Sequence, residues 1–315
     1  MQMIYKPIYA LHKKVRILTL GMRQIPDVQQ EQPRMPIPID RVCVKNLYRR
    51  ICLKSSQSGR VCLDSKITAC IDLPANQRGI HVSRSAESVV ESFADIEYRD
   101  FAKVENALEN LVNVLLNRHG YALRAMAKLE TVYLLDYRDE YVGIEDLIPI
   151  KILITVKKSR GGEAEFKIGV GLEGMTVCPC AQQVFSHMEN IQSVYVPSHS
   201  QRAKMLIVVT SNRNTVDIRD VAVAGLKAFS APLFTILKRV NEYRLVKKAF
   251  ESPKFVEDVV RQAIYNIYSI IKDKVDDNTR ITVKVESFES IHPYDLCAEA
   301  SYTVNELKKL LEPNS

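Results

Sequence analysis

Two different periods of hydrophobic residues run through the chain and predict its helices and strands. Apolar side chains recur at helical spacing over residues 101–118 and again over 254–272, where they form an unbroken stripe. Over residues 280–288 every second residue is apolar instead, which is typical of a half-buried strand. The two periods alternate in blocks, so helices are expected to lie between pairs of strands.

The first half of the chain shows two strands, two helices and two strands, and the second half repeats that order. Short connections make successive elements antiparallel neighbours. The order recurs although the residues do not. Two ββααββ units predict an α+β architecture of antiparallel sheets with helices on one face. The predicted strands are 42–54, 61–72, 121–137, 148–158, 164–174, 203–211, 280–288 and 294–303, and the predicted helices are 85–98, 101–118, 217–230 and 254–272.

The ends of these units divide the chain into three parts. Residues 1–40 are rich in glutamine, proline and charge, and they are predicted to form an extended arm instead of a domain. The first unit then covers residues 41–160 and the second unit covers 161–315.

Composition excludes several classes of protein. The 315 residues are 46% hydrophobic and 26% charged, which excludes a disordered chain and a collagen-like one. No apolar run approaches the ~18 residues that a transmembrane helix needs. The basic N-terminal stretch lacks the continuous apolar region of a signal peptide. We therefore expect a cytoplasmic protein without a membrane partner.

The net charge of +7 leaves two kinds of ligand open. It fits an enzyme that acts on a small polyanion, and it also fits weak nucleic-acid binding. The sequence contains no glycine-rich phosphate loop.

Seven cysteines bear on the redox chemistry of the chain. An odd count without regular spacing argues against the disulfide framework of a secreted protein. The four in the first quarter, Cys43, Cys52, Cys62 and Cys70, stand among apolar residues and are expected to be buried thiols.

Strict up-and-down order in the second unit predicts where its chemistry lies. Three connections, at about 178–202, 231–253 and 290–295, fall at the same end of the unit. They hold most of the candidate soft and basic ligands of this half, namely Cys178, Cys180, His187, His199, Lys238, Arg239 and His292.

A metal site is one interpretation of this end. Cys178 as a single thiolate, with His199 and a carboxylate such as Glu242, would leave an open position on a divalent first-row metal and make a bound water acidic. The plainer interpretation is that Cys178-Pro179-Cys180 is a turn with one buried thiol, His199 a solvated loop residue and Glu242 a surface charge.

Three further positions suit substrate chemistry. Glu257, in the first turn of a helix, either stabilises the helix dipole or grips the N–H edge of a planar ring. His292 lies between two strands and could shuttle protons or simply face solvent. His81 lies in Arg78–Arg84 at a helix start. Ser83 or Ser85 could simply cap this helix, or the two arginines and His81 could hold a phosphate. That segment belongs to the opposite end, so it would need an inverted arrangement or another subunit to reach the metal site.

At these residues the chain resembles the metal-dependent GTP cyclohydrolases of the type IB group, in particular their archaeal members. The resembling stretches occur in family order over about nine-tenths of the sequence. They are Ile25–Gln29, Leu73–Pro74 with Arg78–Arg84, Cys178–Cys180, His199–Arg202, Leu237–Arg239 with Glu242, Pro253–Asp258 and Glu289–His292.

The resemblance implies a bimodular tunnelling fold, which is two ββααββ units per subunit, in a homo-oligomer (dimer or tetramer) with active sites at subunit interfaces. It implies Cys178, His199 and Glu242 as metal ligands, Fe(II) as the metal with Zn(II) or Mn(II) as alternatives, Glu257 as the purine anchor and His292 as the proton-transfer residue. We also expect Lys238, Arg239 and His81 to bind the substrate, and no nucleic acid to be a partner.

The reaction implied by the resemblance starts with water adding at C8 of GTP. The imidazole ring then opens and formate is released. Archaeal members are thought to form 7,8-dihydroneopterin 2′,3′-cyclic phosphate and pyrophosphate, whereas other type IB members form 7,8-dihydroneopterin triphosphate. Two departures stand out: the connection between Cys178 and His199 is long, and Tyr294 occupies the position of a second histidine common in the family. Tyrosine can donate a hydrogen bond there but does not carry protons easily near neutral pH.

Two other functions remain to be tested against this one. A purine-binding or RNA-binding module without turnover would use the basic surface but has no need for a Cys, His and Glu set. A thiol-based reductase of the same fold would use Cys178 or Cys180 as the nucleophile, but the sequence offers no nicotinamide site.

Overall fold

The predicted order of elements is present, and it is built on one continuous sheet. The structure is a computed structural model that describes residues 26–55, 59–94, 97–212 and 216–312. Its strands are β1 (Ile39–Ser55), β2 (Gly59–Leu73), β3 (Glu97–Tyr98), β4 (Arg124–Asp139), β5 (Ile144–Ser159), β6 (Ala164–Val177), β7 (Ser200–Ser211), β8 (Ala231–Pro232), β9 (Arg280–Ser287) and β10 (Leu296–Thr303). Its helices are η2 (Val28–Gln30, a 3₁₀ turn), α1 (Val82–Ser92), α2 (Phe101–Arg118), α3 (Pro179–Met188), α4 (Ile218–Leu226), α5 (Arg239–Glu251), α6 (Val256–Ile271) and α7 (Val304–Leu311).

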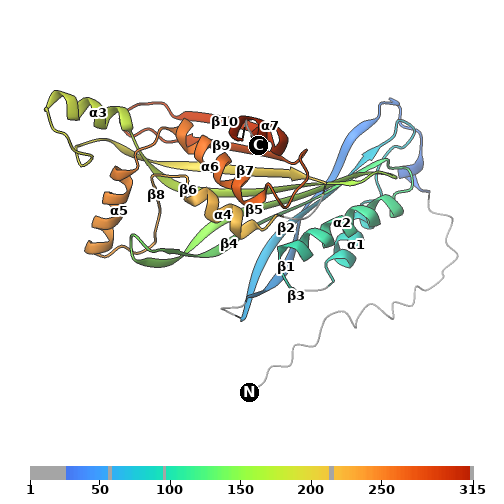
Figure 1. Ribbon diagram of the computed structural model, residues 1–315. Helices are drawn as coiled ribbons and strands as arrows, with labels where there is room; N and C mark the ends of the chain where they lie inside the picture. Colours follow the sequence, from blue (N-terminus) through green and yellow to red (C-terminus); the bar gives the residue numbers. More distant parts are fainter. Residues whose placement is uncertain (1–25, 56–58, 95–96, 213–215, 313–315) are drawn as a thin grey trace, which may run out of the picture.

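The two ββααββ units join edge to edge. The strand order is β10-β9-β7-β6-β5-β4-β2-β1-β3, with β8 paired to β6 (Figure 1). The described strands pair antiparallel except β1 with β3. The two sheets expected from the sequence are therefore one ten-stranded sheet, because β5 and β6 form an ordinary hairpin across the unit boundary. The α+β class and the twofold ββααββ order are confirmed.

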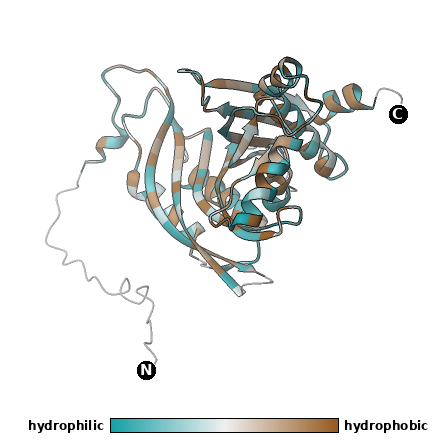
Figure 2. Ribbon diagram, turned by 90° about the vertical axis from the view of Figure 1, so that its left-hand side faces the viewer, coloured by the Kyte–Doolittle hydropathy of each residue, from teal (hydrophilic) through white to brown (hydrophobic). Residues whose placement is uncertain are grey.

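Helices α1 and α2 pack on β1, β2, β4 and β5, and helices α4 and α6 pack on β6, β7, β9 and β10. Apolar and polar residues alternate along the strands, as Figure 2 shows. The stripe predicted over 254–272 is the buried face of α6, where each fully buried large side chain contributes about 1.5–3 kcal/mol. Its buried residues are Val256, Val259, Val260, Ala263, Ile264, Ile267, Tyr268 and Ile271. No described helix combines the length and apolar character of a membrane span.

The predicted helix 85–98 is wrong at its end. Helix α1 ends at Ser92, and Glu97–Tyr98 form β3 beside β1. The buried rings of Phe93 and Tyr98 meet at a centroid distance of 6.5 Å, so the end of α1 packs against β3. The predicted connections 178–202 and 231–253 also contain helices, α3 and α5, and α7 follows the last strand. Most of the predicted arm, residues 1–25, lies outside the described residues.

The expectation of four buried thiols in the first quarter is wrong. Cys43 is bonded to Cys70, and Cys52 to Cys62, across β1 and β2. Each pair is directly opposite in the strand register, with Cα atoms 4.1 and 4.0 Å apart. A one-residue bulge in β1 between Val44 and Leu47 makes both pairs possible. Without that extra residue, Cys52 would face Val61.

We predict that three thiols of the denatured, unreduced protein react with an alkylating reagent and that seven react after reduction. The three free cysteines are Cys178, Cys180 and Cys297. Intact mass before and after reduction measures both numbers. Seven reactive thiols without reduction would contradict the two bridges.

A buried acidic side chain lies within the helical layer. Glu105 of α2 is 1% exposed, and neither carboxyl oxygen has a hydrogen-bond partner among the described residues. Burial, with smaller effects of Asp100 and Asp217, raises the pKa of Glu105 to about 8. The fold therefore favours the protonated acid.

We predict that Glu105→Gln stabilises the protein at pH 9 by roughly 2 kcal/mol, since ionisation of the buried acid penalises the folded state there. Because the folded-state pKa is raised, stability of the wild type falls as pH rises from about 4.5 towards about 8. Denaturant unfolding at pH 5 and pH 9 measures the difference, and the variant should show no advantage at pH 5. An equal effect at both pH values would contradict the assignment.

Candidate active site

The end of β6 brings Cys178 and His199 together. Strands β6 and β7 pair up to Val177 and Ser200, and the pairing continues one residue further. The Cys178 N–H donates to the His199 carbonyl oxygen at 3.0 Å, and the Ser198 hydroxyl donates to the Cys178 carbonyl oxygen at 2.6 Å. The long connection between the two residues therefore returns to its starting point.

Cys178 also starts helix α3. Its sulfur accepts a hydrogen bond from the Ala181 N–H at 3.4 Å, and Pro179 occupies the first turn. The sulfur thus lies at the positive end of the helix, where a negatively charged ligand atom is stabilised. Cys180 is an exposed thiol in the same turn. Cys178 is therefore held by hydrogen bonds at the end of β6, whereas Cys180 lies exposed beyond it.

The same strand end holds the start of α6. The Lys254 N–H donates to the Val177 carbonyl oxygen at 2.9 Å, and its ammonium donates to the carbonyl oxygens of Ala228 and Phe229 at 3.0 and 3.1 Å. Burial lowers the pKa of Lys254. This anchored residue is followed two positions later by the first turn of the helix.

Two carboxylates in that turn have different surroundings. Asp258 accepts from the Phe255 N–H at 3.2 Å and from Arg261 at 2.9 Å, so it caps the helix. Glu257 is exposed, and its carboxylate has no hydrogen bond or ion pair with the described residues. Of the two, Glu257 is the one available to a ligand.

Helix α5 carries the remaining predicted ligand. It buries Leu245 and Ala249 against Val177 and Val142. Glu242 lies one turn before Leu245 on the same side of the helix and is exposed. Lys238 and Arg239 begin the helix and are exposed too.

The β4–β5 turn of the first unit anchors α5. Buried Asp139 pairs with Lys248, and Asn241 donates to the Val142 carbonyl oxygen at 3.1 Å. At the other end of the helix, the Tyr141 hydroxyl donates to Glu251 at 2.6 Å. Both units therefore contribute to the position of this helix.

The donor set is compatible with a metal ion but is not assembled as a complete cluster. Cys178 and His199 are adjacent and offer the soft sulfur and imidazole nitrogen that Zn(II) and Fe(II) accept. In the part of the chain that the structure describes, no three His, Cys, Asp or Glu side chains lie close enough to hold a metal. Glu242 lies on a separate element, in the first turn of α5.

His292 and Tyr294 lie on the loop after β9. Their rings stack at a centroid distance of 4.9 Å, and both side chains are exposed. This loop leaves the sheet beside the start of β7, since the Phe288 N–H donates to the Arg202 carbonyl oxygen at 2.9 Å. The segments predicted to share one end of the second unit do share it.

His81 lies at the opposite end of the molecule, as the up-and-down order predicts. Neighbouring strands connect the end of β2, which leads to His81, with the start of β6, whereas Cys178 follows the end of β6. The 14-residue strand β6 spans roughly 45 Å. Figure 1 shows α1 and α3 at the two ends of the sheet.

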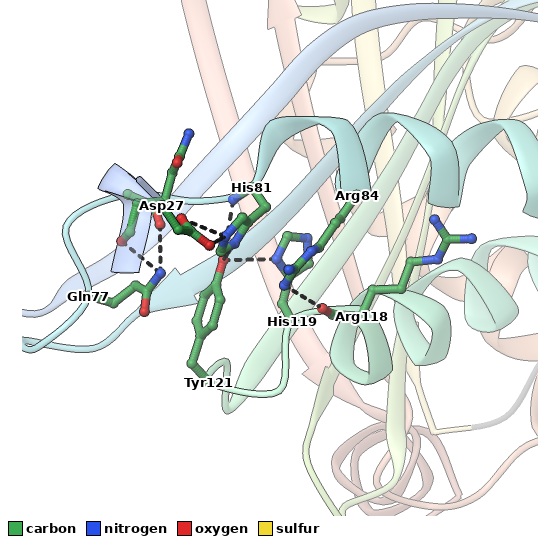
Figure 3. Close-up of polar contacts among 9 residues, drawn as sticks. Asp27, Gln77, His81, Arg84, Arg118, His119 and Tyr121 are labelled. Atoms are coloured by element: carbon green, nitrogen blue, oxygen red, sulfur yellow. Dashed lines mark hydrogen bonds and ion pairs between the residues drawn. The ribbon is translucent and has the colours of Figure 1, made fainter. Parts of the chain in front are cut away.

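A chain of polar contacts surrounds His81 (Figure 3). Its Nε2 lies 3.0 Å from Asp27, and its Nδ1 lies 3.5 Å from the Tyr121 hydroxyl. The same hydroxyl lies 2.9 Å from Nδ1 of His119, whose Nε2 lies 3.0 Å from the Ser85 hydroxyl. These contacts fix the orientation of the His81 ring.

His119 is the buried member of this chain. Burial, reinforced by the charges of Arg84, His81 and Arg118, lowers the pKa of His119 to about 4. Its ring is therefore neutral near pH 7 and serves as a hydrogen-bonding support.

Comparison with known proteins decides the family. The model of the family "Type I GTP cyclohydrolase folE2" matches residues 25–298. The chain belongs to this family. The GTP cyclohydrolase MptA of Aeropyrum pernix is 37% identical over 285 residues, covering 90% of this chain and 98% of the relative. That of Methanosphaera stadtmanae is 30% identical over 310 residues, covering 92% and 99%.

The chain is also similar to a solved structure. Uricase from Arthrobacter globiformis matches with a TM-score of 0.49 at 10% identity, covering 84% of this chain and 93% of the uricase. The resemblance found in the sequence is thus confirmed by the family and the relatives, and with it the prediction of a GTP cyclohydrolase enzyme.

Sequence reasoning missed the residues that support this site. Gln201 contacts the His199 ring directly, and Glu289 contacts Gln201. From the sequence alone, neither residue is assigned a role. The alternation of a strand would have revealed Gln201, which lies two residues after His199 and so on the same face.

Proposed function

We propose that the enzyme hydrolyses GTP at C8 with release of formate, that it requires a metal, and that its products are 7,8-dihydroneopterin 2′,3′-cyclic phosphate and pyrophosphate. The observation that carries the proposal is the backbone hydrogen bond from the Cys178 N–H to the His199 carbonyl oxygen, which holds the two residues opposite each other at the end of β6. The resemblance to archaeal members supports the cyclic product. 7,8-Dihydroneopterin triphosphate is the alternative, and the phosphorus spectrum of the product distinguishes the two.

Cys178, His199 and Glu242 would hold the metal, for which Fe(II) is proposed and Zn(II) or Mn(II) are alternatives. When bound, such an ion makes a coordinated water acidic enough to attack a carbon near neutral pH. The backbone hydrogen bond between Cys178 and His199 supports these two as ligands, and Glu242 on α5 would supply the carboxylate.

The chain's own residues would orient GTP and move protons. The free carboxylate of Glu257 matches the two N–H donors on the edge of guanine, which a carboxylate can accept together. Lys238 and Arg239 provide positive charge for the phosphates. His292, exposed on its loop, would supply protons to the ring nitrogens as their bonds to C8 break.

A second copy of the chain would complete the site in a dimer or tetramer. His81 cannot reach Cys178 within one chain, because the whole length of β6 separates them. One face of the sheet also exposes apolar side chains around a cavity of about 660 Å³, which a second copy would cover. They include Val132, Leu147 and Leu206. We propose a cytoplasmic homo-oligomer, with neither nucleic acid nor membrane as partner.

We predict that Cys178→Ala abolishes metal binding and lowers formate release from GTP by at least ~10³-fold, because it removes a ligand of the ion that activates water. Cys180→Ala should change the rate less than ~3-fold, since Cys180 is an exposed thiol outside the pair. The assay uses anaerobic protein with Fe(II), and metal content is measured for each variant. A larger loss in Cys180→Ala would contradict the ligand assignment, and metal-loaded wild type that binds GTP without formate release would indicate a binding module.

We predict that His81→Ala and Cys178→Ala, each inactive alone, restore activity when their subunits are mixed. In a symmetric dimer with two shared sites, random exchange gives about a quarter of wild-type activity, since half of the dimers are mixed and each has one intact site. Subunits are exchanged under mild denaturant and formate is measured. Mixed dimers without recovered activity would show that each chain completes its own site.

A further inference from the structure

His199 is held from behind by a short chain of side chains. Its Nδ1 lies 3.0 Å from Oε1 of Gln201, and Nε2 of Gln201 lies 3.5 Å from Oε1 of Glu289. The Ser287 hydroxyl donates to the same Glu289 oxygen at 2.8 Å. His199, Gln201 and Ser287 are only partly exposed or buried, so these contacts lie within the packed end of the sheet.

The chemistry of these groups fixes which atom donates in each hydrogen bond of the series. A carboxylate only accepts hydrogen bonds, so the Gln201 amide must turn its NH₂ group towards Glu289. Its carbonyl oxygen then faces His199, and that oxygen can only accept. The Nδ1 of His199 must therefore carry a proton, and in the neutral ring this leaves Nε2 with a free lone pair.

We propose that Gln201, oriented by Glu289, is a positioning residue that selects the His199 tautomer whose Nε2 binds the metal. This inference rests on the proposed metal site. It adds residues that do not touch the metal but decide which nitrogen of the ligand faces it. Loss of a partner of this kind commonly weakens metal affinity by 10- to 100-fold.

The sheet makes this arrangement rigid. His199 and Gln201 are two residues apart at the start of β7, so their side chains emerge on one face. Gln201 is paired with Thr176 of β6 in the strand register. Glu289 is fixed by the Phe288 N–H bond to Arg202. The ligand and its two supports are therefore set by backbone pairing.

The first test is metal affinity. Gln201→Ala should weaken binding of Co(II), titrated anaerobically against a chelator, by about 10- to 100-fold, while the melting temperature of the metal-free protein stays unchanged. Gln262→Ala is the matched control, because Gln262 is a half-buried glutamine with one side-chain hydrogen bond, to Asn266, on α6. Its Co(II) affinity should equal that of wild type.

Exchanging the residues at positions 201 and 289 tests whether position 201 must offer His199 a hydrogen-bond acceptor. The double variant Gln201→Glu/Glu289→Gln keeps a hydrogen-bond acceptor for His199 and an acceptor for Ser287. It reverses the bond between the two positions, so that the amide at 289 donates to the carboxylate at 201. It should restore Co(II) affinity to within about 3-fold of wild type, whereas Glu289→Ala alone should weaken it, because the Gln201 amide is then free to turn over. A residue that only fills space would not give this rescue.

The second test does not need metal. The six histidines allow the ring nitrogens of His199 to be assigned by ¹⁵N NMR of the metal-free protein. The wild type should show the proton on Nδ1, and Gln201→Ala should show a mixture of tautomers. A proton on Nε2 in the wild type, or wild-type Co(II) affinity in Gln201→Ala, would overturn the inference. Wild type that binds no metal but shows the Nδ1 tautomer would instead overturn the proposed metal site.

Discussion

The site depends on the backbone hydrogen bonds at the end of β6. The Val177 carbonyl oxygen holds the start of α6, and the Cys178 N–H holds the residue before β7. Two segments that are distant in sequence are thereby fixed to two consecutive residues at the end of one strand. Side chains carried on paired backbone have little freedom to lose on binding a ligand, which is how a rigid sheet supports precise chemistry.

Much of the fold follows from hydrophobic period alone. Helices α2 and α6 are wide apolar stripes, and the strands that flank them alternate, so their order is present in the sequence. Helix α5 is different because it buries only Leu245 and Ala249, whereas its Val240, Tyr243 and Val246 are exposed, so its apolar residues do not mark one buried face. Helices α3 and α7 do carry local signals, a proline in the first turn and a capping box between Thr303 and Glu306.

The site was predictable as a set of residue types but not as a geometry. Up-and-down order was enough to place Cys178 and His199 at one end and His81 at the other. The contacts of Gln201 with Glu289, and the attachment of α5 to Asp139 of the first unit, depend on side-chain packing between segments far apart in sequence. No periodicity records such packing. The family match supplies the chemistry, and the structure supplies the supporting residues.

The bulge in β1 links the two disulfides to one register of the β1–β2 hairpin. The backbone at Asn46 takes a positive φ of 62°, and the register shifts there by one residue. Sliding either strand by one position would turn the sulfur atoms of each pair to opposite faces. Both disulfides can therefore form only when the two strands are paired in the native register. Once formed, they hold β1 and β2 in that register near the edge of the sheet.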